Sequence, residues 1–264
     1  MQVSKIDNKA IAFPQLRGSL AGLRYPALAE IKYDGEFNYI YISAKDTFTI
    51  NKYGTMRRDF PALNEIGKMV RGLASSATLL CEVYWNEGKL GALYELLSHK
   101  KDDAIKLSVF DIIEFDGSNM KDEEFITRRE VLHELGLGRW LPKCWVVADE
   151  IDVQQRFKET TDEGYEGIVV KDLSAKYVAG PCTQVKMKKK DRTEYEVGHI
   201  DATLERIEIK VPTTPAPAYI MVGCKAPNRY KKHIKLGDMV EIEHQGVLKS
   251  GSLRHPVLIP KKGW

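Results

Sequence analysis

The sequence predicts an α+β domain followed by a small all-β barrel, and three observations support this fold class. Up to about Lys188, strand-like runs alternate with segments of helical periodicity. Beyond Arg192, short β-rich runs are separated by Pro and Gly turns. Between these parts, the polar segment 189–193 has the composition of a hinge. The 264 residues suffice for one medium and one small domain, each with its own core.

The first well-defined elements of the sequence surround Lys32. Ile31 and Tyr33 alternate with Lys32, so Lys32 projects from one side of a short strand and its neighbours from the other. Asp34-Gly35 indicates a turn, and the aromatic and β-branched run 37–42 indicates a second strand. We therefore expect Lys32 at the mouth of a hairpin, pointing into a cleft.

The remaining elements follow from periodicity. Helices are predicted over residues 61–73, 91–97, 127–135 and 153–163. In the C-terminal part, strands are predicted over residues 195–200, 204–211, 219–224, 239–243 and 257–259. Five strands in about seventy residues is the size of an OB-fold barrel.

Charge and composition limit the class of protein. The net charge of +3 is too small for indiscriminate binding of nucleic acid by the whole surface, but the basic residues are clustered. Such clusters fit a groove that follows phosphates, although a solvated charged face explains them equally well. The basic residues predicted to contact nucleic acid are Lys189, Lys190, Arg192, Lys231, Lys232 and Arg254.

The sequence also predicts the cellular location of the protein and the state of its cysteines. No apolar run approaches membrane-spanning length, and the first five residues are not followed by a signal-like apolar core, so we expect a soluble, cytoplasmic protein. Cys81, Cys144, Cys182 and Cys224 are far apart and form no C-x-x-C pair. We therefore expect free thiols rather than a zinc site or a disulfide framework.

Lys32 is the strongest candidate for a catalytic nucleophile in the sequence. A lysine between strands and near acidic residues can lose its proton, attack the α-phosphate of a nucleotide and become a covalent nucleotidyl carrier. An isolated K-x-D-G tetrapeptide is more often a solvated lysine before a turn. Four more motifs follow in order: Leu79-Leu80-Cys81-Glu82-Val83-Tyr84, Leu107-Ser108-Val109-Phe110-Asp111-Ile112-Ile113, Glu166-Gly167-Ile168-Val169-Val170-Lys171 and Val185-Lys186-Met187-Lys188.

Together the five motifs resemble the covalent nucleotidyltransferase superfamily, which comprises ATP-dependent DNA ligases, RNA ligases and mRNA capping enzymes. Residues 251–257 are similar to the closing strand region of DNA ligase C-terminal domains, which favours DNA ligase. The resemblance implies an adenylation (nucleotidyltransferase) domain with antiparallel sheets and flanking helices over residues 1–188, and an OB-fold domain over residues 189–264. It further implies a monomer that uses ATP with Mg²⁺ or Mn²⁺ to seal nicked duplex DNA, with no membrane partner.

The resemblance also implies roles for individual residues. Lys186 and Lys188, on one side of a strand, would hold the α-phosphate. Glu166 and Glu82 would place the metal, and Glu82 would also accept a hydrogen bond from a ribose hydroxyl. Phe110 would stack on adenine, although core packing is the default explanation for a lone Phe. The expected nucleotide-binding set is Glu30, Ile31, Lys32, Lys52, Glu82, Phe110, Glu166, Lys171, Lys186 and Lys188, with Lys32, Lys186 and Lys188 as catalytic residues.

Several positions depart from the pattern of DNA ligases and keep alternatives open. Phe37 and Asn38 stand where an arginine is usual, Lys52 replaces another arginine, and Lys262 lies where a C-terminal arginine is expected. An RNA ligase, a capping guanylyltransferase that uses GTP, and a non-catalytic DNA-end-binding module therefore remain alternatives.

The protonation of Lys32 is left open by the sequence. Burial, Lys186, Lys188 and a metal would lower its pKa, whereas Asp34 would raise it if it lay close.

Overall fold

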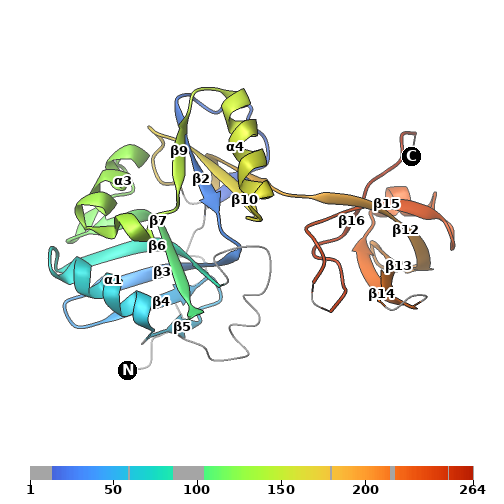
Figure 1. Ribbon diagram of the computed structural model, residues 1–264, viewed down its shortest axis with the longest axis horizontal. Coiled ribbons are helices and arrows are strands. Elements are labelled where there is room, and N and C mark those ends of the chain that lie inside the picture. The colour runs from blue at the N-terminus through green and yellow to red at the C-terminus, as the bar shows by residue number, and fades with distance from the viewer. Residues whose placement is uncertain are drawn as a thin grey trace. The chain divides into compact units, whose positions relative to one another are not determined.

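The computed structural model describes residues 14–58, 60–85, 104–178, 180–214, 218–248 and 250–263. The helix predicted over residues 91–97 lies outside these ranges. The chain divides into two compact units, residues 1–187 and 188–264, each of which is described by itself (Figure 1).

Two sheets form the first unit. The first has the order β1 (Pro14–Arg17), β11 (Gly180–Lys188), β10 (Gly167–Asp172), β2 (Ala27–Lys32) and β9 (Cys144–Val147). The second has the order β5 (Met56–Arg57), β4 (Thr47–Asn51), β3 (Gly35–Ser43), β6 (Ser76–Tyr84), β7 (Lys106–Phe115) and β8 (Ser118–Asn119). Neighbours in the second sheet are antiparallel, whereas β1 runs parallel to β11 in the first.

Helices cover the outer faces of both sheets (Figure 1). Helices α1 (Pro61–Arg71) and α3 (Phe125–Glu134) and the 3₁₀ turn η3 (Leu137–Trp140) bury Leu63, Ile66 and Leu132 against the second sheet. Helix α4 (Glu150–Asp162) packs Val153 on the first sheet. The helices predicted over residues 61–73, 127–135 and 153–163 are thus confirmed with shifted ends; α4 starts earlier because the Asp149 side chain caps it.

The hairpin predicted around Lys32 is wrong. Strands β2 and β3 lie in different sheets, so the chain passes from one sheet to the other at Tyr33-Asp34. Gly35 does not form a left-handed turn, because its backbone φ angle is not positive. A Cβ at Gly35 would lie 2.3 Å from the carbonyl oxygen of Val83, so the glycine permits β3 to approach β6. Lys32 consequently ends β2 at the junction of the two sheets.

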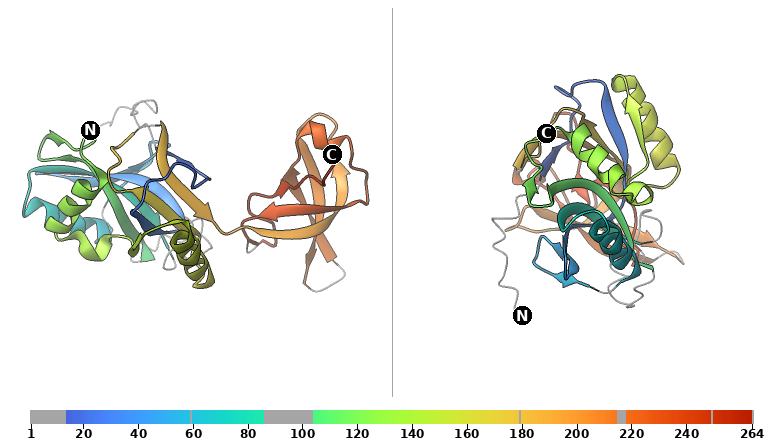
Figure 2. Two further views of the ribbon diagram at one scale, coloured as in Figure 1. Left: turned by 90° about the horizontal axis from the view of Figure 1, so that it is seen from above. Right: turned by 90° about the vertical axis from the view of Figure 1, so that its left-hand side faces the viewer.

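The second unit is a closed barrel with the strand order β12 (Asp191–Ile200), β13 (Arg206–Thr213), β14 (Ala218–Lys225), β16 (Val257–Leu258) and β15 (Met239–His244). The left-hand view of Figure 2 shows these strands, coloured orange to red, from a further direction. A short helix, α5 (Asn228–Lys231), follows β14 in the chain. Alternate residues such as Val197, Ile209 and Ile242 fill the interior. Each of the five strands predicted in this part is confirmed.

Among the helices that the structure describes, none combines the length and the apolar character that a membrane crossing requires. The four cysteines, Cys81, Cys144, Cys182 and Cys224, are not joined in disulfides, and Cys81 and Cys224 are buried.

Candidate active site

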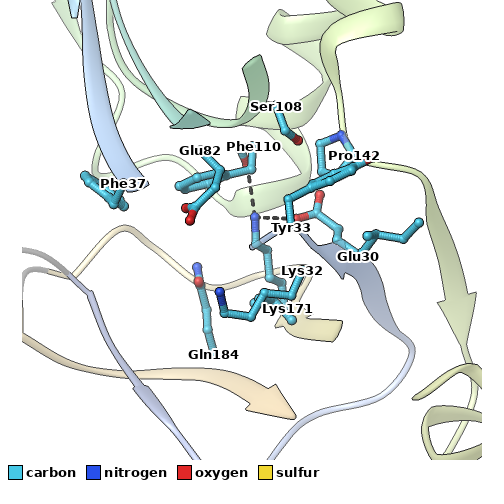
Figure 3. A pocket seen from close by; sticks show the side chains of 12 residues that line it. Glu30, Lys32, Tyr33, Phe37, Glu82, Ser108, Phe110, Pro142, Lys171 and Gln184 are labelled. Atoms are coloured by element: carbon cyan, nitrogen blue, oxygen red, sulfur yellow. Dashed lines mark hydrogen bonds and ion pairs between the residues drawn. The ribbon is translucent and has the colours of Figure 1, made fainter. Parts of the chain in front are cut away.

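A pocket lies between the two sheets of the first unit, and Figure 3 shows it from close by. One side is formed by β2, β10 and β11, and the other by β3, β6 and β7. The two sheets meet here because β2 leads directly into β3. The pocket is lined by Glu30, Ile31, Lys32, Tyr33, Phe37, Glu82, Ser108, Phe110, Pro142, Val169, Lys171 and Gln184.

Lys32 is held by a carboxylate from the neighbouring strand. Lys32 pairs in register with Gly167, which places the preceding Glu166 beside it, and Lys32 Nζ lies 2.6 Å from Glu166 Oε2. Burial lowers the pKa of Lys32, but Glu82, Glu166 and Asp34 together raise it more, so that its pKa lies above the ordinary value. The balance that the sequence left open thus favours the ammonium form of Lys32.

Glu30 anchors a buried ion network under the pocket. Glu30 Oε2 lies 2.6 Å from Lys171 Nζ, and Glu30 Oε1 accepts from Arg129 Nη1 at 2.5 Å. Lys171 also donates to the carbonyl oxygen of Phe110 at 3.0 Å, as Figure 3 shows. Glu30, Lys171 and Arg129 are almost fully buried, and each forms an ion pair within the network. This network therefore fixes β2, β10 and β7 relative to one another.

Aromatic rings form much of the remaining wall. Phe110 points from β7 into the pocket, and its ring centroid lies 5.7 Å from that of Phe37 on β3. Tyr33 lines the pocket and stacks on Tyr84 with centroids 4.5 Å apart. Flat apolar walls of this kind suit a planar base. Phe37, the departure from the ligase pattern noted in the sequence, thus belongs to the pocket.

The carboxylates of the pocket fit a hard divalent cation in part. Glu82 lines the pocket, and both Glu82 and Glu166 act electrostatically on Lys32. In the described part of the chain, no group of three or more His, Cys, Asp and Glu side chains could by itself enclose a metal ion. Mg²⁺ needs few protein carboxylates when phosphates and waters complete its shell, so the two glutamates fit the ion as a partial ligand set.

Other predicted residues lie outside the pocket lining. Lys186 is exposed on β11, on the strand face shared with pocket-lining Gln184, because Val185 and Met187 pack into the core on the opposite face. Lys188 is the first residue of the second unit. Lys52 is exposed, with its Nζ 4.8 Å from the centroid of the Tyr53 ring.

Several residues that line the pocket were not predicted from the sequence. Ser108 and Gln184 could have been found from the period of two, since each lies two residues before an assigned residue of the same strand, Phe110 and Lys186. No comparable signal marks Pro142, which lies before β9, a strand that was not predicted.

Two of the predicted nucleic-acid contacts in the barrel pair with one acidic residue. Lys190 Nζ lies 2.6 Å and Arg192 Nη2 3.1 Å from Glu243. Lys231 donates to the backbone carbonyls of Asp201 and Leu204. Lys189 and Lys232 are exposed, and Arg254 is half-buried.

Comparison with known proteins shows the family of this chain. Residues 10–190 match the family model described as the ATP dependent DNA ligase domain. The chain belongs to this family. It is 26% identical over 166 residues to a DNA ligase of Methanothrix thermoacetophila, covering 57% of this chain but 30% of that protein. It is 37% identical over 79 residues to a probable DNA ligase of Dictyoglomus thermophilum, covering 29% of this chain and 14% of that protein. The matches thus span less than a third of the length of these two relatives.

Solved structures give the same fold. A structure described as DNA binding with a minimal scaffold in Lig E DNA ligases has a TM-score of 0.71 at 14% identity, covering 94% of this chain and 98% of that chain. A mycobacterial DNA ligase D complexed with ATP and MES has a TM-score of 0.54 at 19% identity, covering 94% and 95% of the two chains. As members of one fold, the ligase family structures and this chain share mixed sheets with few helices.

Proposed function

We propose that this protein is an ATP-dependent DNA ligase that seals nicks in duplex DNA through a covalent Lys32–AMP intermediate. One observation carries the proposal: Lys32 enters a pocket with aromatic walls at the junction of two sheets, in a chain of the ATP dependent DNA ligase domain family. ATP as the nucleotide is supported by the bound ATP of the structurally similar DNA ligase D.

The first step requires the Lys32 ammonium to lose a proton. Glu166, at 2.6 Å, is placed to accept it. The free amine then attacks the α-phosphorus of ATP, the N–P bond forms, and the bond to the bridging oxygen of the β-phosphate breaks. Pyrophosphate leaves with that electron pair, and the nitrogen releases a second proton to give the phosphoramidate. AMP then passes to the 5′-phosphate of the nick, and the 3′-hydroxyl displaces it to seal the strand.

The other pocket residues have supporting roles in this proposal. Phe110 stacks on the adenine, and Glu82 accepts from a ribose hydroxyl. The buried Glu30–Lys171 pair holds the backbone of Phe110 in place through the Phe110 carbonyl oxygen. Lys186 and Lys188 neutralise the phosphates, as positioning and charge compensation require in phosphoryl transfer.

Glu82 and Glu166 are the residues that would hold Mg²⁺ or Mn²⁺, consistent with the preference of these ions for oxygen ligands. When bound, the ion supplies charge neutralisation for the phosphate groups.

The proposal extends to the domains and the DNA. Residues 1–188 form the adenylation domain, and residues 189–264 form an OB-fold domain whose basic residues Lys189, Lys190, Arg192, Lys232 and Arg254 contact the duplex. We propose that a monomer acts on the nick. Lys231 would be the weakest contributor, because its ammonium already binds two backbone carbonyls.

Two experiments test the proposed function. The protein is incubated with α-labelled ATP or GTP, and the label that survives denaturing electrophoresis is measured; labelling by GTP alone would indicate a capping enzyme. Sealing of nicked DNA and nicked RNA is then compared. Preference for RNA would indicate an RNA ligase, and absence of any labelling would indicate a non-catalytic binding module.

A further inference from the structure

Gln184 is a polar pocket residue that none of the roles above uses. It lies on β11, where its side chain points into the pocket (Figure 3). The residue is only 8% exposed. Within the described residues, its amide makes no hydrogen bond. Its side-chain N–H groups therefore face the pocket and are available to donate to a ligand.

We propose that the Gln184 amide donates an N–H to a non-bridging oxygen of the α-phosphate while that phosphate is transferred to Lys32. This inference rests on the proposed function and deepens it by adding a residue that contacts the reacting group.

The position of Gln184 favours the phosphate over the base. Gln184 and Lys32 both enter the pocket from the first sheet, whereas Phe110 and Phe37, the rings suited to a base, enter from the second. The α-phosphorus must come within bonding distance of Lys32 Nζ. Gln184 also shares its strand face with Lys186, so the strand presents an amide and a cation on the same side.

The chemical type of the residue is suited to this task. Glu82, Glu166 and Asp34 already surround Lys32 with negative charge. A carboxylate at position 184 would repel the phosphate, whereas a neutral amide donates without adding charge of either sign to the Lys32 equilibrium. A fixed donor aimed at an oxygen where charge develops contributes to the rate of transfer rather than to binding alone.

The test is a single-turnover measurement of self-adenylation at saturating ATP. We expect Gln184→Ala and the similarly shaped Gln184→Met to lose about a hundredfold in rate. Gln184→Glu should lose more, because it adds charge without changing shape. The matched control is Gln154→Glu, the same substitution at an exposed position of α4. Thermal denaturation of each variant establishes that it is folded.

A second arm separates phosphate from nucleoside contacts. Gln184→Met should bind AMP more weakly than the wild type but bind adenosine equally well, as measured by calorimetry. Equal adenylation rates for wild type and Gln184→Met, or an equal loss for AMP and adenosine, would overturn the inference. Failure of the wild type itself to become adenylated would instead contradict the proposed function, so that the two failures are distinguishable.

Discussion

The ammonium of Lys32 and the carboxylate of Glu166 form an ion pair of 2.6 Å where the two sheets of the first unit meet. The pair exists because Lys32 ends β2 opposite Gly167 and β3 then starts in the other sheet. The arrangement favours the protonated form of the proposed nucleophile.

The first prediction concerns the pKa of Lys32. Glu82→Gln removes the largest of the charges that raise it, so the pKa should fall and more amine should be neutral at a given pH. The rate at which an amine-acylating reagent labels Lys32 is measured by peptide mapping at a series of pH values. The midpoint of this pH profile should lie at lower pH in Glu82→Gln than in the wild type. Glu130→Gln, on the exposed face of α3, is the control. An unchanged or higher pH midpoint would contradict this electrostatic account.

As a further consequence of the raised pKa, the free energy of unfolding should depend on Lys32 at alkaline pH. Because the folded-state pKa of Lys32 lies above the unfolded value of 10.5, its contribution is fully present below that pH and is lost as pH rises through the folded pKa. Urea unfolding of wild type and Lys32→Met at increasing pH should show a difference that narrows above the unfolded value.

The second prediction concerns a buried pair that supports the pocket from behind. Asp111 follows Phe110 on β7, and its two oxygens accept from Arg128 at 2.7 and 2.9 Å. Arg128→Ala should destabilise the fold by about 3–5 kcal/mol, because it leaves a buried carboxylate without its partner. Arg156→Ala, which removes a solvent-screened ion pair with Glu159 and a contact with the Trp145 ring, should cost much less. Equal losses of unfolding free energy for Arg128→Ala and Arg156→Ala in urea unfolding would contradict the stabilising role of the buried Arg128–Asp111 pair.

The third prediction concerns Lys171. Replacement by Met keeps the length of the side chain but removes both the ion pair with Glu30 and the hydrogen bond to the Phe110 carbonyl oxygen. We expect a higher KM for ATP in self-adenylation as well as lower stability. Lys158→Met, at an exposed position of α4, should change neither quantity. A variant with unchanged KM would indicate that the network does not position Phe110.

The fourth prediction concerns DNA. Glu243 pairs with Lys190 and Arg192, so Glu243→Gln should release both cations for phosphate contacts and tighten binding of nicked duplex at low salt. The gain should shrink as salt is added, since released counterions drive the binding. Affinity measured by fluorescence anisotropy at several salt concentrations checks this, with Glu150→Gln as a control in the first unit. Weaker binding by Glu243→Gln would mean that the two cations do not contact DNA.

Much of the fold could be predicted because its strands and helices have clear periods. The hairpin at Lys32 was mispredicted because Asp34-Gly35 has turn composition, whereas Gly35 is needed for close approach to Val83. That requirement is tertiary and leaves no local signal. For the site, the motif lysines and glutamates were visible as residue types, but the pairing of Lys32 with Glu166 depends on the register of β2 and β10.

The most direct test of the central claim is to locate the covalent nucleotide. The purified protein is incubated with ATP and Mg²⁺, digested and mapped by mass spectrometry under conditions that preserve phosphoramidates. We predict one adenylyl group on Lys32, with no adduct in Lys32→Arg, and release of the group as AMP when nicked DNA is added. An adenylyl group on another residue, or an unmodified Lys32 in a protein that still seals nicks, would contradict the account.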